Sequence, residues 1–391
     1  MLDYNKILNP KVIDMKPSGI RKFFDIAIEM KDVISLGVGE PDFQTPWHIR
    51  QAGIESLEEG KTRYTSNWGL KELRIAVAKY MQERNNVSYD PNDEVLISVG
   101  GSEAIDLAIR AIVSPGDEVL IPQPSFVCYD PITRLAGGVP VAISTSAENE
   151  FRLTAEQVKS HITPKTKALI LPFPSNPTGA VMRREHLCQL AEVLDGTDII
   201  VISDEIYSEL TYGGVKHVSI ASIGNMRERT IVVNGFSKTY SMTGWRLGFA
   251  CGPAQILKQM TKIHQFAIMS APTTAQYAAI EALRNGRPDV EAMIEEYDMR
   301  RRMIVDGFRR IGLECFEPKG AFYVFPCIKS TGLSSEEFCE QLLCSKHVAL
   351  VPGIAFGESG EGYLRASYCY SVSHIKEALL RIGEFVETLK K

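Results

Sequence analysis

Short apolar runs alternate with amphipathic stretches between about residues 94 and 250 of this chain. Five runs rich in β-branched residues are predicted as strands, at 94–100, 118–124, 167–174, 198–205 and 230–237. They are apolar almost throughout, which is typical of strands covered on both faces. Helical patterns lie between most of them, for example over 102–113. The pattern therefore predicts an α/β fold in which helices cover both sides of a mostly parallel sheet.

The last third of the chain has a different pattern. After two further helical stretches, a long helical periodicity runs over 289–312 and ends at Gly312. Strand-like runs follow at 314–318, 321–326, 349–353 and 362–368, with a helix over 334–346 and a last helix from about 373. This α+β mixture predicts a smaller domain, on which the Pro- and Gly-punctuated N-terminal residues are expected to pack. We predict a large domain over 46–285 and a small domain formed by 1–45 and 286–391.

Composition excludes several classes of protein. The net charge of −5 argues against a nucleic-acid binder that works by phosphate neutralisation. No apolar run approaches the roughly 20 residues of a membrane span, and the N-terminus has no apolar signal-peptide region. The eight cysteines are scattered without a CxxC pair, which indicates reduced packing residues and no metal site. A cytoplasmic enzyme is the leading hypothesis.

Two turns follow predicted strands and carry polar groups. Gly101, Ser102 and Glu103 lie between a strand and a helix, where free N–H groups attract anions. The alternative is an ordinary turn in which Ser102 caps the helix. Asn176 lies in a turn between two prolines and a glycine at the carboxyl end of a strand, where ligands of α/β sheets bind. A rigid turn without a ligand is the other interpretation.

Two further residues follow the run 198–205. Asp204 ends the most apolar strand of the chain, where a carboxylate is costly unless a cation meets it. Tyr207 lies three residues later and could face the same site. The alternative interpretation is that Asp204 merely caps the next segment.

Three cations could carry chemistry. Lys238 follows a strand that we expect to be buried, so its pKa could be lowered and its amine could act as a nucleophile. Arg246 follows eight residues later, and large apolar neighbours argue against a solvated surface loop. Arg365 lies in a strand pattern and could clamp a carboxylate in a bidentate manner, or it could be an exposed strand arginine.

Together these groups are what pyridoxal 5′-phosphate chemistry requires: an anion cradle, a strand-end acid, a nucleophilic lysine and arginines. The chain resembles the fold-type-I aminotransferases, the aspartate aminotransferase superfamily of class I/II, nearly end to end. The resemblance rests on the motifs SNPTG at 175–179, SDEIY at 203–207 and SKTYSMTGWRLG at 237–248. It implies a seven-stranded sheet in the large domain and pyridoxal 5′-phosphate as cofactor.

The resemblance also implies roles for single residues toward the cofactor. Lys238 matches the Schiff-base lysine that shuttles the proton, and Asp204 matches the partner of the pyridinium nitrogen. Tyr207 and Asn176 match the hydrogen-bond donors to the ring's 3′-oxygen, and Phe126 matches the aromatic residue that stacks on the ring. Further cofactor contacts are expected from Gly101, Ser102, Glu103, Ser237, Arg246 and Tyr64.

The substrate contacts and the assembly follow from the same resemblance. Arg365 matches the clamp on the substrate α-carboxylate, together with Gly39 and Asn176, and Ile20 is expected as an apolar lid in an N-terminal gating segment. Tyr64 matches a tyrosine that reaches the phosphate of the neighbouring subunit. A homodimer with shared active sites is therefore expected.

The chain departs from the family pattern at two places. Gly235 stands where some members have a phosphate-binding serine, so Ser237 is expected to compensate. Phe266 lies near the place of the arginine that grips the distal carboxylate in the aspartate-specific branch. Arg110 could replace that arginine, or it could be an ordinary cation on the helix surface.

The predicted function is transfer of the amino group of an L-amino acid to a 2-oxo acid such as 2-oxoglutarate, by way of pyridoxamine phosphate. The stretches 18–23 and 207–212 resemble the aminotransferase A and aromatic aminotransferase group. This likeness favours N-acetyl-L,L-diaminopimelate, an aromatic or an aspartate-like amino acid as the donor. The alternatives are a carbon–sulfur β-lyase on the same scaffold and a regulator with a retired active site.

Overall fold

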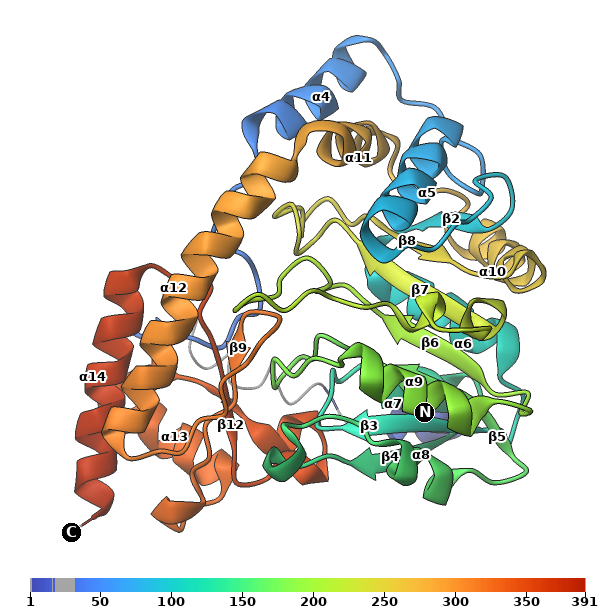
Figure 1. Ribbon diagram of the computed structural model, residues 1–391. Coiled ribbons are helices and arrows are strands. Elements are labelled where there is room, and N and C mark those ends of the chain that lie inside the picture. Colours follow the sequence, from blue (N-terminus) through green and yellow to red (C-terminus); the bar gives the residue numbers. More distant parts are fainter. Residues whose placement is uncertain (1, 16, 18–31, 391) are drawn as a thin grey trace.

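The computed structural model describes residues 2–15, 17 and 32–390, and Figure 1 shows its two packed parts. Ile20, which is expected as an apolar lid, lies outside the described residues. At the N-terminus are the short helices α1 (Tyr4–Ile7) and α2 (Pro10–Ile13). Among the helices of the described residues, none is long and apolar enough to cross a membrane.

A seven-stranded sheet forms the centre of the larger part. Its strands are β2 (Val95–Ser98), β3 (Glu118–Gln123), β4 (Val139–Ser144), β5 (Thr166–Leu171), β6 (Ile200–Asp204), β7 (Thr230–Gly235) and β8 (Gly248–Cys251). They lie in the order β2-β8-β7-β6-β5-β3-β4, and β8 alone in this sheet runs antiparallel to its neighbours. The mostly parallel sheet expected from the sequence is confirmed.

Helices cover both faces of this sheet. On β5, Ala168 and Ile170 pack with α6 (Gly100–Ile112), α7 (Tyr129–Leu135) and α10 (Ala254–Ala267). The alternate residues, Leu169 and Leu171, pack with α8 (Ala155–His161) and α9 (Arg184–Leu194) on the other face. The near-continuous apolar runs in the sequence therefore reflect burial on two sides. The remaining helices of this part are α4 (Trp47–Glu58), α5 (Lys71–Asn85) and α11 (Thr273–Asn285).

The second part is built around a long helix. This helix, α12 (Arg287–Ile311), packs against α14 (Val372–Leu389) and next to α13 (Ser335–Lys346). The short strands β9 (Tyr323–Val324), β11 (Val351–Pro352) and β12 (Leu364–Ser367) form an antiparallel sheet in the order β11-β12-β9. A parallel pair joins β1 (Ile34–Ser35) to β10 (Val348–Ala349). This pair ties an N-terminal segment to the C-terminal part, and we propose the two domains with the bounds predicted above.

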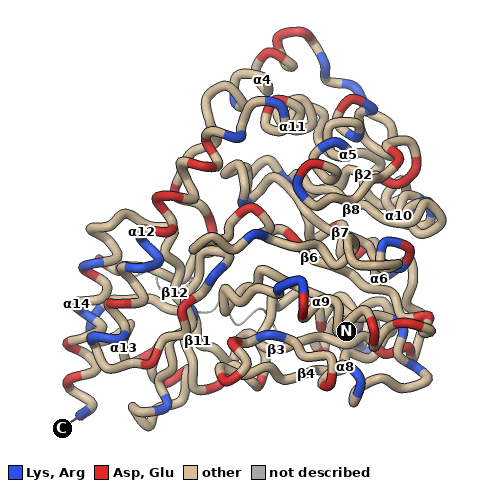
Figure 2. The backbone as a smooth tube through the Cα atoms, viewed as in Figure 1, with Lys and Arg blue, Asp and Glu red and all other residues tan. Residues whose placement is uncertain are grey.

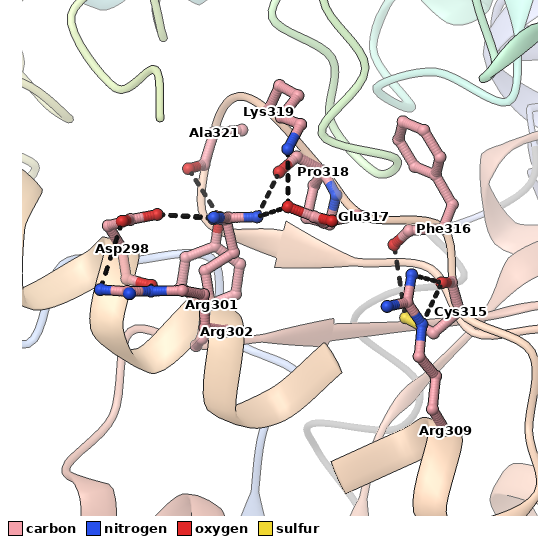
Figure 3. A network of polar contacts seen from close by, with 11 residues as sticks. Asp298, Arg301, Arg302, Arg309, Cys315, Phe316, Glu317, Pro318, Lys319 and Ala321 are labelled. Carbon is pink, nitrogen blue, oxygen red and sulfur yellow. Dashed lines mark hydrogen bonds and ion pairs between the residues drawn. The ribbon is translucent and has the colours of Figure 1, made fainter. Parts of the chain in front are cut away.

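A buried arginine anchors the segment that leads into β9. Arg301 on α12 donates from Nε to Asp298 Oδ1 (2.8 Å) and from Nη1 to Glu317 Oε1 (2.8 Å), as Figure 3 shows. Lys319 Nζ also donates to Glu317 Oε1 at 2.6 Å. These two hydrogen bonds, from Lys319 and then Arg301, lower the pKa of Glu317 to about 2. The turn before β9 is thus held to α12, while charges of both signs are interspersed along the outer helices (Figure 2).

Some local predictions differ from the structure. Strands β4 and β8 were not predicted, because β4 is a half-exposed edge strand and β8 has only four residues. The predicted strand at 314–318 is reduced to one isolated bridge between Cys315 and Pro326. Helix α6 begins at Gly100 with Val99 at its N-cap, so the alternative interpretation, in which Ser102 caps this helix, was wrong.

Candidate active site

A cavity of about 290 Å³ lies at the carboxyl ends of β5, β6 and β7, beside β9 and β12. It gathers most of the site residues predicted from the sequence. The predicted residues that line it are Gly39, Gly101, Ser102, Phe126, Asn176, Asp204, Tyr207, Ser237, Lys238, Arg246 and Arg365. Residues from segments more than 300 positions apart thus meet where the edge of a parallel sheet presents its loops, as in other α/β folds.

Lys238 lies in the loop after β7, inside this cavity. Its Nζ donates to the carbonyl oxygen of Gly39 at 2.7 Å and lies 5.7 Å from the centroid of the Phe322 ring. Burial lowers the pKa of Lys238 to about 8. The neutral amine, which is the nucleophilic form, is therefore much more accessible near neutral pH than in a solvated lysine.

Asp204 is the last residue of β6 and is buried. Its Oδ2 accepts from the Tyr129 hydroxyl at 2.7 Å, and its Oδ1 accepts from the Ile206 N–H at 3.2 Å. Burial raises the pKa of Asp204, although both hydrogen bonds oppose the rise. A buried carboxylate with few donors is stabilised when a cationic group approaches it from the cavity.

Arg365 and Asn176 meet at the opposite side of the cavity. Arg365 Nη1 donates to Asn176 Oδ1 at 3.0 Å, and Nη2 donates to the carbonyl of Gly37. Its Nε is buried without a hydrogen-bond partner among the described residues. Because Asn176 Oδ1 is occupied, the free function of this amide is its Nδ2 donor. Burial lowers the pKa of Arg365, and an incoming carboxylate would supply both charge and acceptors.

The start of α6 and Arg246 lie together in the cavity, at the place where the sequence predicts an anion cradle. Gly100 has φ +77°, a left-handed conformation that favours glycine, and a Cβ there would lie 2.8 Å from Arg246 Nη2 at the end of its flexible side chain. Arg246 Nη1 donates to the carbonyl of Thr243 at 3.1 Å. Ser102 and Ser237 add hydroxyls to the cavity wall. Free helix N–H groups, hydroxyls and a guanidinium together suit a phosphate.

Three predicted residues lie elsewhere. Both carboxylate oxygens of Glu103 serve the protein itself, because Oε1 pairs with His264 Nδ1 at 2.7 Å and Oε2 accepts from the Val99 N–H. Tyr64 is 80% exposed and outside the cavity of its own chain, as a residue that serves a neighbouring subunit would be. Arg110 is half exposed and pairs with Asp106 at 2.9 Å, which favours the surface-cation interpretation.

Two tyrosines of the cavity were missed by sequence reasoning. Tyr129 donates to Asp204 and its ring meets Phe126 edge-on, at 6.0 Å between centroids. Its place at the start of α7, three residues after Phe126, was a usable signal. Tyr323 also lines the cavity and has its hydroxyl 2.9 Å from that of Tyr207. No local pattern indicated this contact.

Comparisons with known proteins agree with this geometry. Residues 31–382 match the model of the family aminotransferase class I and II. A putative aminotransferase of Bacillus subtilis is 52% identical over 97% of this chain and 98% of that protein. An aspartate aminotransferase of Pyrococcus abyssi is 49% identical over 96% and 97% of the two chains. The crystal structure of an aromatic aminotransferase from Pyrococcus horikoshii has a TM-score of 0.90 at 44% identity, over 95% of this chain and 99% of that one.

Proposed function

Because the chain belongs to the class I and II aminotransferases, which are pyridoxal 5′-phosphate enzymes, we propose that it transfers the amino group of an L-amino acid to 2-oxoglutarate. Membership confirms the resemblance, the enzyme class and the cofactor expected from the sequence. The observation that carries the specific proposal is one cavity in which the buried amine of Lys238 lies with Asp204 and Arg365.

The residues of the cavity fit the cofactor. Bound pyridoxal 5′-phosphate supplies a conjugated ring that accepts the electron pair left when the Cα–H bond of an amino acid breaks. Asp204 holds a proton on the pyridine nitrogen, and this cationic partner offsets the cost of burying the carboxylate. Asn176 and Tyr207 donate to the 3′-oxygen. Gly101, Ser102, Ser237 and Arg246 bind the phosphate.

Lys238 has two tasks in this proposal. Its Nζ would hold the cofactor. As a free amine, the same Nζ would take the proton from the substrate Cα and deliver it to the cofactor's C4′. A pKa of about 8 suits both directions, because a base and its conjugate acid are then both populated near neutral pH. Arg365 binds the substrate α-carboxylate and so orients Cα toward Nζ.

We propose that the donor is aspartate-like, aromatic or N-acetyl-L,L-diaminopimelate. The relatives support a range of this kind, since one is named an aspartate and another an aromatic aminotransferase. A homodimer is proposed from the family to which the chain belongs and from the exposure of Tyr64. Carbon–sulfur β-elimination is not favoured, because the three relatives reported above are named aminotransferases.

A half-reaction tests the proposal. The cofactor-loaded protein is mixed with single amino acids of each class, and 2-oxo acid and ammonia are measured against enzyme concentration. One equivalent of 2-oxo acid without ammonia, restored to turnover by 2-oxoglutarate, is expected for one donor class. Continuous release of ammonia and pyruvate from cystathionine, without any such half-reaction, would overturn the proposal in favour of the lyase.

A further inference from the structure

Tyr323 on β9 contacts two residues of the site, Tyr207 and Arg365, and has no role in the function proposed above. It is 1% exposed and lines the cavity. Its hydroxyl lies 2.9 Å from the Tyr207 hydroxyl, and the two rings meet edge-on with centroids 5.9 Å apart. The Arg365 guanidinium lies 4.5 Å from the centroid of the Tyr323 ring, with Phe356 at 4.9 Å as a second aromatic contact.

The backbone lies close to this hydroxyl on one side. A Cβ at Gly39 would lie 2.1 Å from Tyr323 Oη, so the backbone of the segment after β1 passes close to the hydroxyl. On the other side, the turn that leads into β9 is fixed to α12 through Arg301 and Glu317 (Figure 3). Gly39 and the turn that is fixed to α12 therefore restrict the Tyr323 side chain and keep its hydroxyl close to Tyr207.

The direction of this hydrogen bond follows from proton counting. Each phenol carries one hydrogen, and Tyr207 uses its own when it donates to the 3′-oxygen. Tyr323 must then donate to Tyr207 Oη.

We propose that Tyr323 is a positioning residue that acts through Tyr207. Its hydroxyl donates to Tyr207 Oη and so directs the Tyr207 hydrogen into the cavity, while its ring supports the Arg365 guanidinium. Donors in series polarise one another, so Tyr323 strengthens the donation of Tyr207 to the 3′-oxygen. This inference rests on the proposed function, because it needs a cofactor oxygen in front of Tyr207.

The test measures the pH dependence of the visible absorbance of the loaded enzyme, which reports the pKa of the cofactor-linked nitrogen of Lys238. Donation to the 3′-oxygen lowers this pKa, so a weaker donor raises it. Tyr323→Phe removes the hydroxyl and keeps the ring. We expect the pKa of the cofactor-linked nitrogen to rise by about 0.2–0.7 units, because the hydrogen bond from Tyr207 to the 3′-oxygen loses about 10–30% of its strength. Tyr323 replaced by 3-fluorotyrosine, a more acidic phenol, should shift the pKa downward.

Two control series separate this role from a structural one. Tyr368 is equally buried and donates to the carbonyl of Ala321 at 3.1 Å, so Tyr368→Phe loses a buried hydroxyl near β9 and should not shift the titration. Tyr207→Phe should raise the pKa more than Tyr323→Phe does. In the Tyr207→Phe background, Tyr323→Phe should add nothing, because the relay is already broken.

The outcomes are distinguishable. If Tyr323→Phe leaves the wild-type titration unchanged, or shifts it equally with and without Tyr207, the inference is overturned and the proposed function stands. If the wild type shows no titrating band that depends on Lys238, the proposed function fails and this inference fails with it. Should Tyr323→Phe not fold, the fluorinated variant still decides the matter, because an unchanged or raised pKa in that variant contradicts the relay.

Discussion

Two neighbouring carboxylates at the end of β6 belong to regions of opposite character. Asp204 faces the cavity and accepts two hydrogen bonds among the described residues. Glu205 points away from it, is fully buried and accepts four, from the side chains of Ser203, Asn85, His217 and Ser219. At this strand end, Asp204 thus has free hydrogen-bonding capacity, whereas the hydrogen-bonding capacity of Glu205 is filled.

The same division continues along the chain. Tyr207 lines the cavity, whereas Glu209 lies outside it and accepts from Tyr80, Arg84 and Arg287 on helices α5 and α12. Burial alone therefore does not identify a functional carboxylate. Unsatisfied bonding capacity in a cavity identifies it, since buried polar groups without a functional reason are normally satisfied. We call Asp204 and Tyr207 the cavity side, and Glu205 and Glu209 the far side. We expect substitutions on the cavity side to change catalysis and substitutions on the far side to change the free energy of unfolding.

The largest effect is expected for Lys238→Met. Loss of the amine should lower kcat/KM by about 10⁴-fold or more. The apoprotein should become more stable at pH 7 by about 2–3 kcal/mol, because burial lowers the pKa of Lys238 to about 8 from about 10.4 in the unfolded chain. Between these two pKa values the unfolded state binds more protons than the folded state. The free energy of unfolding of the wild type therefore rises from pH 8 to 10.5, and its difference from that of Lys238→Met disappears. Urea unfolding of both apoproteins across this range measures it.

On the far side, Glu205→Ala should have the largest effect on stability. It leaves four donors without an acceptor, three of them buried and the fourth, His217, 12% exposed, and the free energy of unfolding should fall by about 3–5 kcal/mol. Below the unfolding temperature, kcat should stay within about tenfold of wild type. Asp204→Ala is the matched control at the adjacent position, with the opposite profile: a large loss of kcat and little loss of stability. Equal stability losses in the two variants would refute the division.

Arg365→Lys should show an intermediate effect confined to substrate binding. A point ammonium cannot reproduce the two-pronged guanidinium or its stacking on Tyr323, so KM for the amino acid should rise by about 30–100-fold, or about 2–3 kcal/mol. Arg110→Lys is the control on the helix surface. If Arg110→Lys instead raises KM for dicarboxylic substrates, the surface-cation interpretation of Arg110 is wrong.

The sequence predicts the cavity side better than the far side. Asp204, Asn176 and Lys238 follow strands whose apolar runs are visible locally, and parallel strands bring their ends to one edge. The contacts of Tyr323 with Tyr207 and of Glu205 with Asn85 join positions 116 and 120 residues apart. Such pairs depend on how the packed elements meet, and no local periodicity encodes them.

The limits of local pattern also explain the missed strands. An edge strand such as β4 alternates little, and β8 is too short to show a period. The strand predicted at 314–318 is irregular, since it pairs with the rest of the chain through one bridge at Cys315, and Glu317 is tied to Arg301 and Lys319 there.

The smallest effect is expected for Glu209→Gln, which removes the charge and keeps the shape. Its partners Arg84 and Arg287 are each more than 40% exposed, so water can solvate them when the carboxylate is gone. The loss should be about 1–2 kcal/mol at pH 7, less than for Glu205, whose donors are mostly buried. Burial raises the pKa of Glu209, but hydrogen bonds from Arg84 and Tyr80 outweigh it and lower the pKa below its ordinary value. The stabilisation is therefore complete above about pH 4.5 and is lost as the pH falls through the folded-state pKa. Unfolding of wild type and variant between pH 3 and 7 should show a difference that shrinks toward low pH, whereas a constant difference would mean that Glu209 acts by shape alone.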